Sequence, residues 1–193
     1  MIKRICIFCA SSKQVAKTHL DAASETGKIL ASHSISVVYG GGLVGSMGSL
    51  AASILNYNGK IIGIIPRFMM DLEWGNTNVS ELIVVETMAE RKNKMLENTD
   101  AVVALPGGTG TLDELMEVMA LKKLGMYTKP IIILNTDGFY DHLLKFFERM
   151  IKDKFIRPEH QRLYEVASKP EEIMIKIKEA PLWDSTAIKI ATL

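Results

Sequence analysis

Residues 101–114 read AVVALPGGTGTLDE, an apolar run followed by a glycine-rich turn and the start of a helical pattern. The apolar run predicts a buried strand, and the turn predicts the start of a helix. The first backbone N–H groups of a helix have no partner within it, and glycines let a phosphate approach the backbone closely. Glu114 would lie near the start of this helix, beside the bound anion. We therefore expect chemistry on a phosphorylated molecule rather than simple storage of one.

The same alternation of apolar strands and amphipathic helices extends along the chain. We expect strands at 4–9, 36–39, 60–65, 81–85, 101–105 and 130–134. Helical spacing occurs at 15–32, 46–57, 88–98, 111–124 and 139–154, and the tail adds segments at 158–163, 166–167 and 171–179. This order predicts a single α/β domain over residues 1–180, a doubly wound parallel sheet with helices on both faces. Residues 181–193 are expected to form a loosely held tail.

The composition excludes several functional classes. The 193 residues carry a formal net charge of +1, which offers no electrostatic argument for nucleic acid or for an anionic membrane. No window approaches the roughly 18 consecutive apolar residues that a membrane span needs. The start of the chain is charged and lacks a signal-peptide pattern, so we expect a cytoplasmic protein. A P-loop ending in Lys-Ser or Lys-Thr is absent, which argues against hydrolysis of nucleoside triphosphates.

Three loops are expected to form one shared site, because ligands bind beyond the carboxyl ends of the strands in doubly wound folds. They are residues 10–12, 40–42 and 106–111. A G-x-G-x-x-G pattern at Gly40, Gly42 and Gly45 follows the second strand rather than the first. The acid that would bind a dinucleotide ribose should stand near Gly63, which lies in an apolar strand. The pattern therefore favours a mononucleotide or sugar-phosphate contact, or close packing of one loop against another.

The two cysteines, Cys6 and Cys9, form a C-x-x-C pattern inside a predicted strand. Side chains three positions apart in a strand point to opposite faces, whereas a redox pair needs its first cysteine at a helix N-terminus. No second cysteine pair or histidine cluster completes a metal site. We interpret both cysteines as buried core residues.

Arg91 and Lys92 are adjacent on a predicted helix, and such pairs usually form a solvated face. This helix leads into the strand before the glycine-rich turn, however, so Arg91 could reach the anionic ligand through paired hydrogen bonds. Glu73 is a lone acid in a long connection, and by itself this setting indicates a position on the protein surface.

With these motifs in view, the chain resembles the Lonely Guy family of cytokinin riboside 5′-monophosphate phosphoribohydrolases, long labelled lysine decarboxylases. Residues 107–114 match the family pattern G-G-x-G-T-x-x-E, and Met88, Arg91 and Lys92 match M-x-x-R-K. Residues 39–48 match Y-G-G-G-x-x-G-x-M-G. The likeness covers about residues 2–175.

The resemblance implies a Rossmann-like fold, a homodimer or larger homo-oligomer, and no metal or other cofactor. The implied reaction cleaves the N-glycosidic bond of AMP or isopentenyladenosine 5′-monophosphate, giving free base and ribose 5-phosphate. Arg91 and Glu114 become the catalytic pair. The implied substrate contacts are Ser12, Gly41, Gly42, Glu73, Met88, Lys92, Gly107, Gly108, Thr109, Gly110 and Thr111.

The chain departs from the family pattern at Ala10, Ala89, Thr109 and Ala120-Leu121. None of these positions is a proposed catalytic group, so the departures bear on the preferred base rather than on the reaction. Two other functions stay open. A nucleotide or cofactor carrier, such as the related molybdenum-cofactor carriers, would need the glycine loops but not Glu114. A decarboxylase would need pyridoxal phosphate on a lysine, and no lysine stands in a recognisable setting for it.

Overall fold

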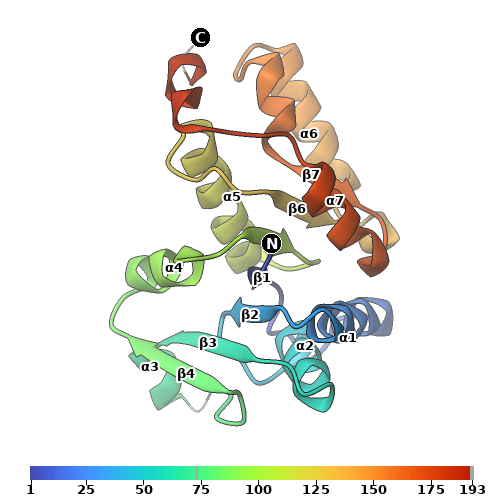
Figure 1. Cartoon of the computed structure of the whole chain (residues 1–193), viewed down its shortest axis with the longest axis vertical. Coiled ribbons are helices and arrows are strands. Elements are labelled where there is room, and N and C mark those ends of the chain that lie inside the picture. Colours follow the sequence, from blue (N-terminus) through green and yellow to red (C-terminus); the bar gives the residue numbers. More distant parts are fainter. Residues whose placement is uncertain (73, 192–193) are drawn as a thin grey trace.

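A computed structural model describes residues 1–72 and 74–191 of the chain (Figure 1). Within this part, seven parallel strands form one sheet in the order β4-β3-β2-β1-β5-β6-β7. The strands are β1 (Arg4–Phe8), β2 (Ser36–Tyr39), β3 (Ile61–Pro66), β4 (Glu81–Val85), β5 (Ala101–Ala104), β6 (Ile131–Leu134) and β7 (Glu165–Ala167). The predicted α/β fold, a Rossmann-like doubly wound parallel sheet in a single domain, is confirmed.

Helices α1 to α6 connect successive strands, as a parallel sheet requires, and α7 follows the last strand. They are α1 (Lys17–Ser32), α2 (Gly45–Asn56), α3 (Arg67–Asp71), α4 (Met88–Leu96), α5 (Thr109–Lys123), α6 (Asp141–Lys152) and α7 (Ile173–Glu179). Short 3₁₀ helices are η1 (Thr136–Gly138), η2 (Pro158–Leu163), η3 (Pro170–Glu172) and η4 (Ser185–Ile190). The structure differs from expectation in α3, which lies in the predicted loop after β3. It also differs at α5, which begins at Thr109 because Gly108 is its extended N-cap.

The sheet is covered on both faces, and side chains along one strand alternate between the two cores. Ile5 and Ile7 of β1 pack with α1, α2 and α7, whereas Cys6 and Phe8 pack with α4, α5 and α6. Cys9 belongs to the first core, on the face opposite Cys6. Both cysteines are free and buried, so the interpretation of the C-x-x-C pattern as core is confirmed.

The order of the strands brings three loops together. The chain passes outward from β1 to β4 and then returns to place β5 on the other side of β1. The ends of β2, β1 and β5 are level, because Ile7 pairs with Tyr39 and Phe8 pairs with Ala104. The loops that follow these three strands therefore start side by side, at the switch point where doubly wound folds bind ligands.

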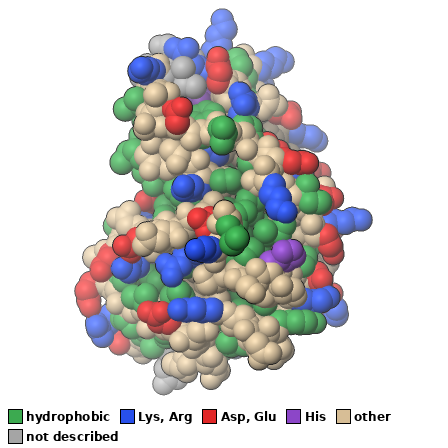
Figure 2. Space-filling view, in the orientation of Figure 1, with side chains coloured by type: hydrophobic (Ala, Val, Ile, Leu, Met, Phe, Trp, Pro, Cys, Tyr) green, Lys and Arg blue, Asp and Glu red, His purple; other side chains and the backbone are tan. Residues whose placement is uncertain are grey.

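The surface carries no large region of one charge on the face shown in Figure 2, where basic and acidic side chains are interspersed. None of the helices in the described residues has the length and apolar character needed to cross a bilayer. Beyond α7 the chain contacts α5, because the Trp183 indole Nε1 donates a hydrogen bond to the Lys122 carbonyl at 2.6 Å. The domain limit at residue 180 stays a prediction.

Candidate active site

A cavity of about 630 Å³ lies at the carboxyl ends of β1, β2 and β5. Its volume suits a small ligand, since such pockets usually hold about 300–1,000 Å³. The wall includes residues from all three expected loops, among them Ser12, Gly42 and Gly108. The expectation that these loops share one site is therefore confirmed at the level of geometry.

The N-terminus of α5 forms one end of this cavity. Gly108 is the N-cap, and Thr109, Gly110 and Thr111 form the first turn, whose N–H groups begin the helix. Apart from the adjacent backbone, a Cβ added at Gly108 or Gly110 would meet no described atom within 4 Å. Packing therefore does not require glycine at these two positions of the cavity lining, where the missing side chains leave open space. The helix dipole makes this open end favourable for an anion.

Gly107 differs from its neighbours. A Cβ there would lie 2.1 Å from Oγ1 of Thr111, so the tight turn itself requires glycine. Gly107 lies outside the described cavity lining, whereas Thr111 is part of it. Gly107 thus shapes the turn that presents the other residues.

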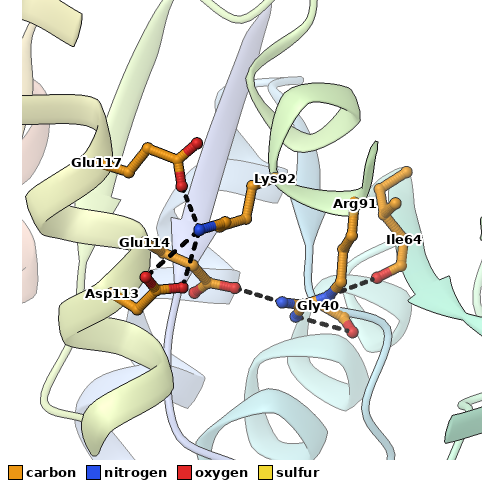
Figure 3. Close-up of polar contacts among 7 residues, drawn as sticks. All are labelled: Gly40, Ile64, Arg91, Lys92, Asp113, Glu114 and Glu117. Atoms are coloured by element: carbon orange, nitrogen blue, oxygen red, sulfur yellow. Dashed lines mark hydrogen bonds and ion pairs between the residues drawn. The ribbon is translucent and has the colours of Figure 1, made fainter. Parts of the chain in front are cut away.

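Arg91 and Glu114 form a buried ion pair at the cavity wall (Figure 3). Nη1 of Arg91 donates to Oε1 of Glu114 at 2.6 Å, and the two side chains are only 6% and 5% exposed. Burial raises the pKa of the Glu114 carboxyl above its ordinary value, and the Arg91 guanidinium opposes that shift. A buried carboxylate with a raised pKa beside a cation is typical of catalytic sites. Arg91 is thus not part of a solvated face.

Two backbone carbonyls hold the Arg91 guanidinium in place. Nε donates to the carbonyl of Ile64 at 3.1 Å, and Nη2 donates to that of Gly40 at 3.3 Å. A Cβ at Gly40 would lie 2.1 Å from Nη2, so glycine is needed there for Arg91 to fit. The β2 loop therefore positions a site residue directly.

The rest of the G-x-G-x-x-G pattern packs loops together. Gly45 has a φ of 65°, and a Cβ there would lie 2.4 Å from the carbonyl oxygen of Ser12. Gly41, with a φ of 78°, packs against Ile65 and lies outside the described cavity lining. Gly42 is part of the lining. The interpretation of this pattern as close packing of loop against loop is confirmed for Gly45.

Lys92 is half-buried and faces α5 instead of the cavity. Its Nζ lies 3.1 Å from Oδ2 of Asp113 and also contacts Oε2 of Glu117. The described residues that line the cavity do not include Lys92, whereas they include Met88 at the start of the same helix. Glu73 lies outside the described residues.

Sequence reasoning did not single out several residues of the wall. The apolar ones are Leu43, Val44, Ile65, Met69 and Trp74, and Met47 of the pattern at residues 39–48 lies beside them on the wall. Lys13 is a cation on the wall, directly after the Ser11-Ser12 loop. Its position next to that loop was a signal that could have identified it, whereas Met69 and Trp74 come from the connection after β3, which carries no motif.

No group of three or more His, Cys, Asp or Glu side chains in the described chain is arranged to hold a metal ion. Cys9 reaches the cavity wall, but burial raises its pKa, and the Glu114 charge raises it further. A thiol with a raised pKa is a poor nucleophile. Cys9 is therefore a poor candidate for a nucleophile at this wall, which also carries Glu114 and Arg91.

Comparison with known proteins agrees with this geometry. A family model described as "Possible lysine decarboxylase" matches residues 47–177. The chain is 42% identical over 177 residues to "Probable cytokinin riboside 5′-monophosphate phosphoribohydrolase LOGL9" of Oryza sativa subsp. japonica, covering 92% of this chain and 78% of that protein. It is 39% identical to "Cytokinin riboside 5′-monophosphate phosphoribohydrolase LOG3" of Arabidopsis thaliana, covering 97% and 88%.

Solved structures share the fold. The molybdenum cofactor binding protein of Rippkaea orientalis superposes with a TM-score of 0.70 at 24% identity, covering 93% of this chain and 97% of that one. The molybdenum cofactor carrier protein of Chlamydomonas reinhardtii gives 0.69 at 22% identity, covering 93% and 98%. At these identities the likeness concerns the fold alone. The sequence relatives are closer and extend over nearly the whole chain, and the protein therefore belongs to the Lonely Guy family of cytokinin riboside 5′-monophosphate phosphoribohydrolases.

Proposed function

We propose that this protein hydrolyses the N-glycosidic bond of nucleoside 5′-monophosphates and releases an adenine-type base and ribose 5-phosphate. The observation that carries the proposal is the buried Arg91–Glu114 pair, which shares one cavity with the N-terminus of α5. A phosphate-binding site beside a carboxylate is the combination that cleavage of a nucleoside monophosphate needs. The names of the curated relatives support the same reaction.

The 5′-phosphate would bind at the N-terminus of α5. Gly108, Thr109, Gly110 and Thr111 all line the cavity, and the space beside Gly108 and Gly110 is open. Backbone N–H groups and the helix dipole favour the phosphate there. Binding energy from the phosphate then fixes the ribose and positions its reacting carbon, C1′.

Cleavage of the bond between C1′ and the base creates positive charge on the ribose, as in other glycoside hydrolases. A water oxygen bonds to C1′ while the electron pair of the broken bond passes to the base nitrogen. Glu114 in its ionised form can accept the proton that the water loses and then release it to solvent, while the departing base takes up one proton from solvent, so the enzyme returns to its starting state. The carboxylate can also stabilise the charge on the ribose.

A guanidinium donates hydrogen bonds without giving up a proton, so we do not assign Arg91 as a general acid. Its three hydrogen bonds within the described chain occupy three of the five guanidinium N–H donors, so two remain for substrate. We assign it the role of orienting Glu114 and contacting the bound nucleotide.

The base would lie against the apolar part of the wall, where Met47, Met69 and Trp74 offer flat and adaptable contacts. Ser12 and Met88 line the same cavity and complete the proposed substrate contacts. The proposed substrates are AMP and isopentenyladenosine 5′-monophosphate. Glu73 stays a predicted contact.

The decisive experiment measures release of free base from both nucleotides by the wild type and by Glu114→Gln. This substitution keeps the size of the side chain and removes its negative charge. We expect turnover by the wild type and loss of turnover in the variant, with affinity for the nucleotide retained. Adenosine should be a poor substrate. Equal rates of hydrolysis for AMP and adenosine would contradict the proposed phosphate-binding site.

A carrier function is the alternative, since two solved structures of this fold bind molybdenum cofactor. A carrier has no use for a carboxylate at the sugar, so the buried Glu114 favours the enzyme. Tight binding of both nucleotides by the wild type without release of base would establish the carrier.

We further propose a homodimer or larger homo-oligomer, as the family resemblance implies, and a cytoplasmic location, as expected from the sequence. Light scattering coupled to size-exclusion chromatography would give the mass of the assembly. Fractionation of the cells would give its location.

A further inference from the structure

Two ion pairs, formed by neighbouring residues, join α4 to α5. Arg91 and Lys92 are adjacent on α4, and their acidic partners Glu114 and Asp113 are adjacent on α5. Figure 3 shows the two pairs extending between the same two helices. Arg91 and Glu114 are buried at the cavity wall, whereas Asp113 is 56% exposed.

Lys92 has two acidic partners. Its Nζ lies 3.1 Å from Oδ2 of Asp113 and 3.3 Å from Oδ1, and it also contacts Oε2 of Glu117. Asp113 and Glu117 stand four positions apart, so they occupy one stripe of α5, which faces α4. Glu114 occupies the next stripe, which faces the cavity. The helix thus directs one acid to the substrate and two acids to Lys92.

The charge around Lys92 does not favour a phosphate. The ammonium and the two carboxylates together carry a net charge of −1, which repels an anion. The hydrogen bonds to Glu117 and Asp113 raise the pKa of Lys92, so the ammonium stays protonated and engaged with them. Lys92 also lies outside the described lining of the cavity.

We propose that Lys92 is a positioning residue that holds α4 against α5, so that Arg91 meets Glu114 in the catalytic geometry without Lys92 touching substrate. This inference rests on the proposed function. It replaces the substrate contact that the family resemblance implies for Lys92. It also gives a physical reason for the adjacency of Arg91 with Lys92 and of Asp113 with Glu114.

The test compares Lys92→Met, Lys92→Arg and the control Lys94→Met. Lys94 lies on the same helix, but it pairs at 2.7 Å with Glu97, the C-cap residue of that helix. In Lys92→Met we expect kcat to fall by about 10- to 100-fold, since small displacements of catalytic groups have effects of this size. The Kd for AMP should stay within about threefold of the wild type, because no substrate contact is lost. Lys92→Arg should recover most of kcat, and Lys94→Met should behave as the wild type.

The pH profile separates positioning from a general loss of stability. Burial raises the pKa of Glu114, while Arg91 and Lys92 lower it and Asp113 raises it. Removing Lys92 should therefore move the acid limb of kcat to higher pH. A merely destabilised protein would lose activity without this shift.

A double-mutant cycle identifies the partners. A variant that combines Asp113→Asn with Glu117→Gln should show the same fall in kcat as Lys92→Met. Adding Lys92→Met to that variant should lower kcat little further. A rise of tenfold or more in the Kd of Lys92→Met for AMP, but not for adenosine, would overturn the proposal. If the wild type releases no base, the proposed function fails by itself. In that case the same cycle is measured with the thermal unfolding midpoint as the readout. Additive effects of the substitutions on this midpoint would refute the contact between the helices.

Discussion

Replacing Gly110 with alanine should separate folding from ligand binding. Gly110 lies in the first turn of α5, lines the cavity and has a φ outside the left-handed region. Apart from the adjacent backbone of α5, the added methyl group would meet no described atom within 4 Å. It would instead occupy the space in which we place the 5′-phosphate. We therefore expect the variant to fold normally but to bind the phosphate of the ligand weakly.

The substitution should affect stability and ligand affinity in opposite directions. Alanine in place of glycine within a helix raises the free energy of unfolding by about 0.5–1 kcal/mol. Losing one hydrogen bond between the backbone and a charged phosphate costs about 1.5–3 kcal/mol. That loss weakens affinity for AMP by about 10- to 150-fold. We therefore expect a protein that is slightly more stable and binds AMP much more weakly.

Urea unfolding measures the first quantity, and titration calorimetry with AMP measures the second in a Glu114→Gln background, where the nucleotide is not hydrolysed. Gly27→Ala in α1 is the matched control, because its added Cβ would lie 2.8 Å from the carbonyl oxygen of Leu50. That variant should show the reverse pattern, since overpacking costs about 1–3 kcal/mol of stability. Its affinity for AMP should not change.

Either of two results would refute the reasoning. Unchanged affinity for AMP in Gly110→Ala would mean that the phosphate does not bind at the N-terminus of α5. A loss of stability greater than about 1 kcal/mol would mean that the space beside Gly110 is not open, because exposed Gly→Ala changes in a helix normally stabilise.

Three further predictions concern buried charges. Arg91→Ala leaves the Glu114 carboxylate buried without its partner. It should lower the free energy of unfolding in urea by about 3–5 kcal/mol. A loss below about 1 kcal/mol would contradict the buried pair. Because burial raises the pKa of the Glu114 carboxyl, kcat should fall as the pH drops through a midpoint above the ordinary range of a glutamate. A kcat that does not fall on acidification through that range would contradict an ionised, buried Glu114 as the active form. Burial also lowers the pKa of Lys122 to about 8. The unfolded lysine then binds more protons than the folded one, so the free energy of unfolding should rise between about pH 8 and pH 10 in the wild type and less in Lys122→Met.

The sequence alone predicted the sheet, the connecting helices and the loops of the site. Apolar runs and helical spacing are local signals, so β5, the turn after it and α5 were recognisable from residues 101–124. The alternation of side chains along a strand correctly separated Cys6 from Cys9. The short helix α3 was missed, because its five residues are too few to show a period.

Only the tertiary structure decided which residues meet. Adjacent basic residues on a helix indicate a solvated face, yet Arg91 is buried against Glu114, which is 23 positions away, and against Gly40, which is 51 positions away. These contacts depend on the placement of β5 beside β1, which no local pattern encodes. The sequence likewise does not distinguish Gly107 from Gly110. In the structure, Thr111 fills the space where a Cβ at Gly107 would lie, whereas the corresponding space at Gly110 is open. The physical reason is that composition and spacing report each segment's own conformation, while pairing and open space depend on segments far apart in the chain.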